Sequence, residues 1–207
     1  IPNLLLRNIP RELMMAVEEA LGAGAQRAHA AAKGMDEGHL PHVVGQMRHF
    51  HMNELFHRAL TVGDASPSAI RGNGIVSGRS GIFRLARFNI PKSFWINGRR
   101  SQTRRQMSFV NKIIEPLVQP GLFDQYKTPS DAVAFFVACF SGSLHVQPES
   151  PVSIQIAMPD HDMRGWLFRE PVDTFLQRYE QQQVEQDDLA KPKLKKSKSQ
   201  ENAGTKS

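Results

Sequence analysis

Residues 132–140 read AVAFFVACF, the longest uninterrupted apolar stretch of the chain. The segment just before it, Thr128-Pro129-Ser130-Asp131, is typical of a helix start, because such side chains accept hydrogen bonds from first-turn N–H groups. A helix that is apolar on every side belongs at the centre of a domain. The sequence therefore predicts a buried central helix here, with the other elements arranged around it.

The same apolar stretch also helps to predict the cellular compartment of the protein. It is far shorter than the roughly 20 residues that span a bilayer, and the opening IPNLLLRNIP has neither the basic leader nor the cleavage site of a signal peptide. The single Cys139 lies within the stretch, which excludes an intramolecular disulfide and predicts a buried thiol. We expect no membrane partner and a cytoplasmic location, although the chain begins with Ile1 rather than Met and could lack an N-terminal element.

Downstream of the apolar stretch, the pattern predicts a second kind of structure. Residues 153–158 (SIQIAM) alternate as a strand does, residues 159–164 form a turn, and residues 165–169 (GWLFR) return as the partner strand. An amphipathic helix is predicted from residue 170 onwards. From about residue 181 the composition becomes polar and Lys-rich, so we predict a disordered tail over 181–207.

Upstream, helical spacing predicts two helices joined by a short loop, over residues 11–33 and 36–60. β-rich segments at 74–77 and 81–90 predict a hairpin, and a short strand is predicted at 93–97 (SFWIN). Residues 103–106 have the form of a capping box and predict a helix over 103–117. The fold class is therefore α+β: one domain over residues 1–180, with a helical pair at 1–62 and a mixed part at 71–180.

Charge is strongly segregated. Residues 71–112 contain ten Lys and Arg and no Asp or Glu, whereas the whole chain carries only +6, so the rest sums to −4. A solvated face is the plain alternative, but Phe83, Phe88, Phe94 and Trp95 are interleaved with the cations, which suits base stacking beside phosphate contacts. A polyanionic partner is therefore expected.

The start of the helix at Thr103 is the most specific part of this stretch. Arg104 and Arg105 in the first turn oppose the helix dipole and stand next to Arg99 and Arg100. A bound anion would reverse that cost, because it would meet both guanidinium groups and free backbone N–H groups. We expect nucleic acid (DNA or RNA) or a nucleotide as the ligand, bound by the following residues: Arg79, Arg84, Arg87, Trp95, Arg99, Arg100, Arg104 and Arg105.

Histidines form the second cluster. His42, His49 and His57 share one stripe of the helix predicted at 36–60. A hydrogen-bonded polar face is the first interpretation, and a metal site lacks both HExxH and an obvious further ligand. No metal and no cofactor are therefore predicted. Acid–base catalysis by these histidines beside the arginines is the alternative function, as in a metal-independent nuclease or a nucleotide-transfer enzyme.

A third hypothesis is a protein-interaction module whose basic face docks an acidic partner. The turn at Asp160, His161 and Asp162 is explained by turn chemistry alone, and the glycines between residues 72 and 81 match neither a P-loop nor a dinucleotide-binding motif. The Lys-rich end serves equally well as a nucleic-acid tail or as a solubilising tail. The sequence leaves open whether the protein is an enzyme and what its oligomeric state is.

Overall fold

The computed structural model describes residues 1–91, 94–118, 129–142 and 147–190, with side chains to residue 181. Its helices and strands, in chain order, are α1 (Pro2–Asn8), α2 (Arg11–Ala32), α3 (Leu40–Val62), β1 (Ser77–Ser80), β2 (Phe83–Pro91), α4 (Gln102–Ser108), β3 (Ala132–Phe140), β4 (Ser153–Pro159), β5 (Trp166–Pro171) and α5 (Val172–Ala190). Three 3₁₀ helices accompany α4, namely η1 (Trp95–Arg100), η2 (Phe109–Ile113) and η3 (Glu115–Leu117).

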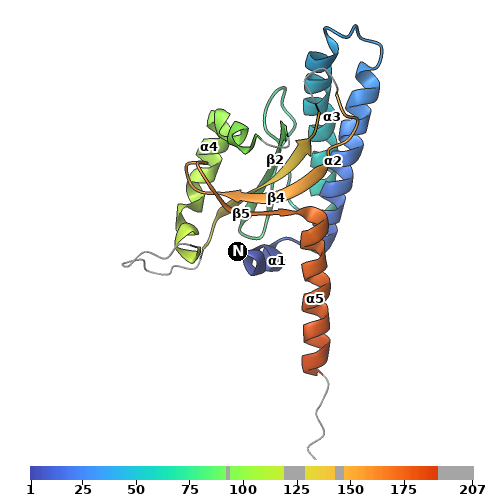
Figure 1. Ribbon diagram of the computed structural model, residues 1–207. Helices are drawn as coiled ribbons and strands as arrows, with labels where there is room; N and C mark the ends of the chain where they lie inside the picture. The colour runs from blue at the N-terminus through green and yellow to red at the C-terminus, as the bar shows by residue number, and fades with distance from the viewer. Residues whose placement is uncertain (92–93, 119–128, 143–146, 191–207) are drawn as a thin grey trace, which may run out of the picture.

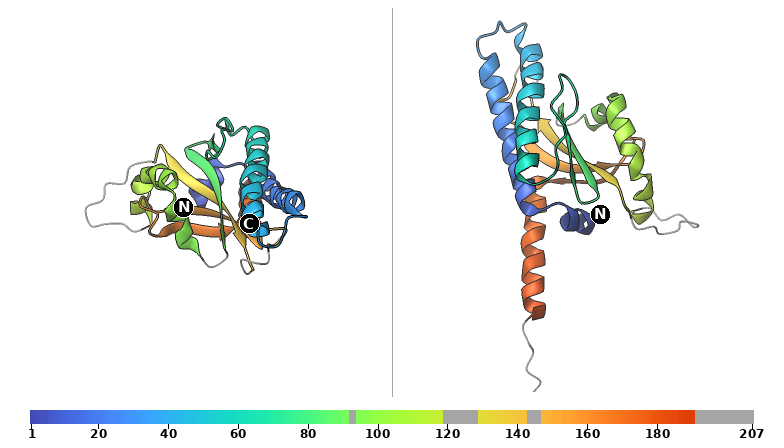
Figure 2. Two further views of the ribbon diagram at one scale, coloured as in Figure 1. Left: turned by 90° about the horizontal axis from the view of Figure 1, so that it is seen from above. Right: turned by 180° about the vertical axis from the view of Figure 1, so that it is seen from behind.

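The strands form one sheet in the order β1-β2-β3-β4-β5. Only β2 and β3 are parallel, and the other three pairs are antiparallel. The helical hairpin of α2 and α3 covers one face of the sheet together with α1 and the start of α5, and α4 with its 3₁₀ helices covers the other (Figures 1 and 2). The α+β class and both predicted hairpins, β1-β2 and β4-β5, are confirmed.

The prediction for residues 132–140 is wrong at the level of the element, because this stretch is the central strand β3 and not a helix. All nine of its residues are buried. Alternate side chains enter two separate cores: Phe136 packs under α2 and α3, whereas Phe135 packs under α4. A strand covered on both faces is apolar at every position, and this pattern is indistinguishable from that of a buried helix over nine residues.

The first hairpin lies a few residues further along the chain than predicted. Its strands are Ser77–Ser80 and Phe83–Pro91, and the turn is formed by Gly81 and Ile82. Gly81 has a φ of +54°, and a Cβ there would lie 2.3 Å from Asn8 Oδ1. Glycine is therefore required both by the turn and by the close approach of α1. The short strand predicted at SFWIN is also wrong, since Trp95 begins the 3₁₀ helix η1.

Apart from the stretch at residues 132–140, the predicted helices are present with shifted ends. The N-terminal pair is confirmed as α2 and α3, and α1 was not predicted. The capped helix begins at Gln102 and continues as 3₁₀ turns to Leu117. Helix α5 continues to Ala190, beyond the predicted start of disorder, whereas residues 191–207 of the predicted tail lie outside the described residues. Within the described ranges, no helix is both long and apolar enough to cross a membrane.

Candidate functional site

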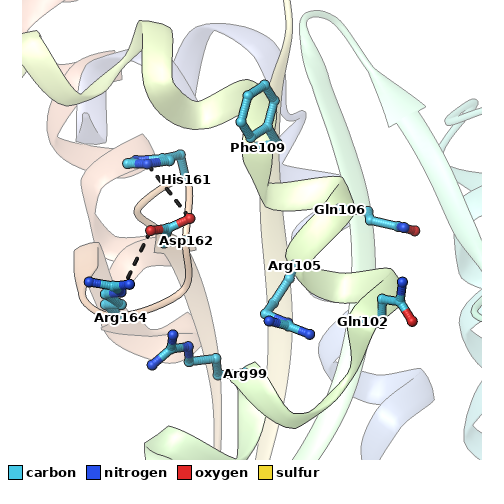
Figure 3. A pocket seen from close by; sticks show the side chains of 8 residues that line it. All are labelled: Arg99, Gln102, Arg105, Gln106, Phe109, His161, Asp162 and Arg164. Atoms are coloured by element: carbon cyan, nitrogen blue, oxygen red, sulfur yellow. Dashed lines mark ion pairs between the residues drawn. The ribbon is translucent and has the colours of Figure 1, made fainter.

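A cavity of about 550 Å³ lies between α4 and the turn that joins β4 to β5 (Figure 3). We call it the arginine pocket; it is lined by Arg99, Gln102, Arg105, Gln106, Phe109, His161, Asp162 and Arg164. Arg99 and Arg105 come from η1 and α4, and Arg164 reaches the same space from the opposite wall. Three guanidinium groups from two distant segments of the chain therefore converge on one cavity.

The β4–β5 turn is held by Asp160. Its carboxylate accepts the backbone N–H groups of Asp162, Arg164 and Gly165, at 3.1, 2.8 and 2.7 Å. Met163, with a φ of +55°, turns its side chain inward and is 4% exposed in the core beneath α4. The flanking side chains are thereby left to line the pocket, and Asp160 has the turn-forming role that its sequence context predicts.

On the opposite wall, Arg104 and Arg105 have different surroundings. The Arg104 guanidinium donates from Nε to Gly98 O at 2.8 Å and from Nη2 to Asn97 O at 3.3 Å, and it lies 4.7 Å from the ring centroid of Phe88. Burial lowers the pKa of Arg104. The Arg104 backbone N–H donates to Ser101 Oγ, which caps α4. Arg104 therefore fixes η1 to α4 from the inside, while Arg105 is exposed at the pocket.

Buried Asn111 joins the two walls. Its Nδ2 donates to Val133 O at 3.0 Å and to Pro159 O at 2.8 Å, and its Oδ1 accepts the Val133 N–H at 2.8 Å. Pro159 is the last residue of β4 and immediately precedes the turn. The segment that follows α4 is thus fixed to the start of β3 and to the end of β4, which sets the distance across the pocket.

The pocket has an excess of positive charge. The only carboxylate among its described lining residues, Asp162, lies 3.6 Å from Arg164 Nε and 3.7 Å from His161 Nε2. Neither Arg99 nor Arg105 forms an ion pair within the described part of the chain. Two cations thus face the cavity without a counter-charge.

His161 adds a titratable cation at this edge. Glu115 Oε1 lies 2.7 Å from His161 Nδ1 and also accepts the His161 backbone N–H at 2.8 Å. The hydrogen bond to Glu115 is the largest cause of the raised pKa of His161. Burial, the second-largest effect, lowers this pKa, and the charges of Glu115, Asp162 and Asp160 each raise it by less. The contact with Glu115 also orients the ring, so that Nε2 faces Asp162 at the pocket.

An apolar surface adjoins these charges. The side chain of Phe109 is 62% exposed and meets the His161 ring edge-on, with the centroids 6.3 Å apart. Gln102 and Gln106 extend from the same helical wall (Figure 3). An exposed ring beside guanidinium groups can stack on a planar group whose phosphate the arginines hold.

The predicted binding residues are divided among several environments. Only Arg99 and Arg105 line the arginine pocket. Arg79 lies 3.8 Å from Asp131, Arg84 is exposed near the start of β2, and Arg100 lines a different cavity. Trp95 is half-buried against Trp166, with the Arg169 guanidinium 4.5 Å from its ring centroid.

Arg87 is a buried structural group, 6% exposed. Its Nε donates to Asn53 Oδ1 at 2.9 Å, its Nη1 donates to Asn89 Oδ1 at 3.0 Å, and its Nη2 donates to the His49 and Arg48 carbonyls at 2.9 and 3.4 Å. Burial lowers the pKa of Arg87 to about 9. Its N–H groups are directed at α3 and at its own strand rather than at an external anion.

The histidine stripe does not form one site. His49 lines a cavity of about 210 Å³ together with Arg87 and Arg104, and burial, followed by the charge of Arg87, lowers its pKa. His42 and His57 are absent from that lining. At 1.5 Å per residue they lie about 10 and 12 Å from His49 along α3, too far to act on one reacting atom.

Sequence reasoning missed His161, Arg164, Phe109 and Glu115 as members of a site. The turn chemistry of residues 160–165 was recognised, but no spacing in the sequence relates that turn to α4.

Among the described residues, no group of three His, Cys, Asp or Glu side chains is placed to hold a metal ion. Comparison of the chain with protein-family models, with curated proteins and with solved structures gives no match. The function therefore has to be inferred from the geometry of the chain itself.

Proposed function

We propose that the protein binds single-stranded nucleic acid or a nucleotide at the arginine pocket. The observation that carries this proposal is the convergence of Arg99, Arg105 and Arg164 on one cavity whose lining includes a single carboxylate. A guanidinium group offers two parallel N–H donors that match two phosphate oxygens, and charge-assisted bonds of this kind are about twice as strong as neutral ones.

The exposed ring of Phe109 favours a base over inorganic phosphate alone. Stacking of a base on an aromatic side chain contributes about 1–3 kcal/mol and tolerates any base identity. A base can reach this ring only when it is free of a duplex, which is why the ligand is single-stranded. His161, when protonated, adds a further positive charge beside the phosphate position.

The test is the binding of fluorescein-labelled 12-mers of oligo(dT) and oligo(U), followed by fluorescence anisotropy. Arg105→Gln and Arg164→Gln should each weaken binding by about tenfold, as expected when a charged contact worth about 1.4 kcal/mol is lost. The matched control is Arg84→Gln, which removes an exposed arginine outside the pocket and should leave the affinity unchanged. Phe109→Ala should weaken the binding of both oligonucleotides by a larger factor than the binding of inorganic phosphate.

Salt dependence supplies an independent measurement. Each phosphate neutralised on a single strand contributes about −0.7 to the slope of log K against log salt. The wild-type protein should therefore show a clear negative slope. Arg105→Gln should make this slope less negative by about 0.7, the contribution of one phosphate contact. Absence of binding, a slope near zero, or equal losses in the pocket variants and in Arg84→Gln would contradict the proposal.

A second candidate function is cleavage of RNA at the same pocket, favoured by the 2.7 Å contact between Glu115 and His161. In such a reaction His161 takes the proton of a ribose 2′-hydroxyl as this oxygen attacks phosphorus, and returns a proton to the leaving 5′-oxygen. Oligo(U) incubated with the protein in EDTA should be shortened, and His161→Gln should abolish cleavage while reducing binding only slightly. An intact oligonucleotide after prolonged incubation would rule out cleavage and leave binding alone.

A further inference from the structure

A second cavity, of about 610 Å³, lies beyond the C-terminal ends of β2 and β3. We call it the strand-end pocket. Because β2 and β3 are the parallel pair of the sheet, Ile90 and Phe140 at their ends face the same edge. Helix α3 supplies Arg48, and η1 supplies Asn97 and Arg100. The volume falls within the range of about 300–1,000 Å³ that small-molecule sites occupy.

No carboxylate of the described residues balances the buried charge of Arg48. Its side chain is 7% exposed, its Nη1 donates to Gln147 Oε1 at 3.1 Å, and its Nη2 donates to Pro148 O. The guanidinium carbon lies 4.0 Å from the ring centroid of Phe140. All of these partners are neutral, and buried arginines are ordinarily paired with an acid. Burial lowers the pKa of Arg48 to about 10, so the group keeps its charge at neutral pH.

One donor of Arg48 lacks a partner within the part of the chain that the structure describes. The buried Nε forms no hydrogen bond with any of the described residues. A buried N–H without an acceptor costs about 1–3 kcal/mol, and more when the group is charged. An oxyanion in the strand-end pocket, which Arg48 lines, would supply the missing counter-charge to this incompletely bonded guanidinium group. The unbalanced charge of Arg48 is therefore evidence for an anionic ligand, separate from the presence of the cavity.

The rest of the lining indicates what the anion is attached to. Arg100 is exposed and supplies a second cation, and the described residues that line the pocket include no Asp or Glu. The other walls are largely apolar, formed by Ile90, Phe140 and Phe94, whose ring is 58% exposed. A few polar groups at one place in an otherwise apolar cavity are typical of sites for amphiphilic small molecules.

We propose that the strand-end pocket binds a small organic anion, with its acidic group at Arg48 and Arg100 and its apolar body against Ile90, Phe94 and Phe140. This site is independent of the arginine pocket, since the two share none of their lining residues. The recognised chemistry is an oxyanion on an aromatic or aliphatic body, whether the oxyanion is a carboxylate, a sulfonate or a phosphate. Free phosphate alone lacks the apolar part and should bind weakly.

The test compares two fluorescent probes that differ only in the acidic group. 8-Anilinonaphthalene-1-sulfonate carries a sulfonate, and N-phenyl-1-naphthylamine has the same ring system without it. With the full chain, the sulfonate probe should bind at one site per chain and at least tenfold more tightly than the neutral probe. Arg100→Gln should weaken binding of the sulfonate probe several-fold and leave the affinity for the neutral probe unchanged. Arg84→Gln should change neither affinity.

Arg48→Gln should also weaken binding of the sulfonate probe, and a second variant keeps the test decisive if Arg48→Gln fails to fold. A Cβ at Gly45 on α3 would meet no atom within 4 Å, and Gly45 lines the pocket, so the side chain of Gly45→Leu should occupy part of the cavity. It should abolish binding of the sulfonate probe, whereas Gly22→Leu, at an equally open position on α2, should not. Cooperative thermal unfolding of each variant establishes that it is folded.

Three outcomes would overturn the proposal. Equal affinity for the two probes would remove the role of the arginines. Undiminished binding in Gly45→Leu would place the probe elsewhere. Displacement of the sulfonate probe by saturating oligo(dT) would place it at the arginine pocket, which would contradict a separate strand-end site and leave the nucleic-acid proposal intact.

Discussion

Arg84 and Arg87 lie three residues apart on β2, yet their side chains have opposite surroundings. Arg84 is exposed, whereas Arg87 points toward α3 and donates to two asparagine side chains and two backbone carbonyls. Alternation along the strand places the two side chains on opposite faces of the sheet, since odd-numbered residues of β2 face α3. The two residues therefore form a matched pair for separating structural from functional arginines.

Replacement of Arg87 should destabilise the fold. Arg87→Met leaves Asn53 Oδ1 and the His49 carbonyl without their donor in a buried region, and losses of this kind typically cost about 2–4 kcal/mol. Arg84→Gln should change the free energy of unfolding by less than about 0.5 kcal/mol. Urea unfolding followed by far-UV circular dichroism gives both values, and similar small changes for the two variants would contradict the structural role of Arg87.

Binding at the arginine pocket should depend on pH through His161. Because its pKa is raised, His161 is protonated below that pKa, and the added charge favours a bound phosphate. Affinity for oligo(dT) should therefore be highest at low pH and fall as pH rises through the raised pKa of His161. Glu115→Gln removes the main cause of the shift, so the fall should move to lower pH.

Anisotropy titrations between pH 5 and pH 9 measure this profile. His161→Gln serves as the control, since its affinity should be nearly independent of pH across the range where wild type changes. The same sign applies to stability: the contribution of the His161–Glu115 contact is present at low pH and is lost as pH rises through the folded-state pKa. A profile of His161→Gln identical to that of wild type would assign the pH dependence to another group.

The sequence identified part of the site at the scale of the residue. Charge segregation pointed to Arg99 and Arg105, which do line the arginine pocket. The charge pattern does not distinguish these two arginines from the half-buried Arg104. The guanidinium group of Arg104 donates to the carbonyls of Asn97 and Gly98 because of the path that the chain takes between η1 and α4, which the sequence does not reveal. Arg164 comes from a turn about sixty residues further on, and sequence separation of that size carries no information on distance.

At the scale of the element, the sheet depends on β3. Its register places Phe135 beside Ala86 on one side and Ala157 on the other, so that small residues flank the large ring. The hairpins on either side were predicted because turns and alternation are local signals. The strand itself was mistaken for a helix because burial on both faces removes alternation, and the parallel pairing with β2 depends on a crossover that no local pattern reveals.

The packing of α2 on α3 yields a test within one helix. A Cβ at Gly24 would lie 2.8 Å from Met52 Cα, whereas a Cβ at Gly22 would meet no atom within 4 Å. Gly22→Ala should stabilise the protein by up to about 1 kcal/mol through helix propensity alone. Gly24→Ala gains the same propensity but forces the helices apart, and such overpacking costs about 1–3 kcal/mol. Thermal unfolding should therefore show opposite shifts.

At the scale of the whole molecule, the two sides of the sheet are occupied by different kinds of structure. The helical hairpin and the start of α5 share one core with Phe83 and Phe136, and this core extends to α1. The core beneath α4 is smaller; Met107 and Val110 pack against it, and their chain neighbours Gln106 and Phe109 line the arginine pocket. Arg99, Arg105 and Phe109 of the arginine pocket are thus carried by the layer with less buried apolar surface, as expected for elements that open locally.

Amide hydrogen exchange under native conditions tests this arrangement across the molecule. The amides of residues 135–139 belong to a strand that pairs on both sides and is buried on both faces, so they should exchange only through global unfolding. The amides of η1 and α4 should exchange faster, through local opening, and saturating oligo(dT) should slow them without affecting β3. Equal protection of α4 and β3 in the free protein would contradict the two-layer account, and unchanged protection of α4 with the oligonucleotide bound would place that ligand elsewhere on the molecule.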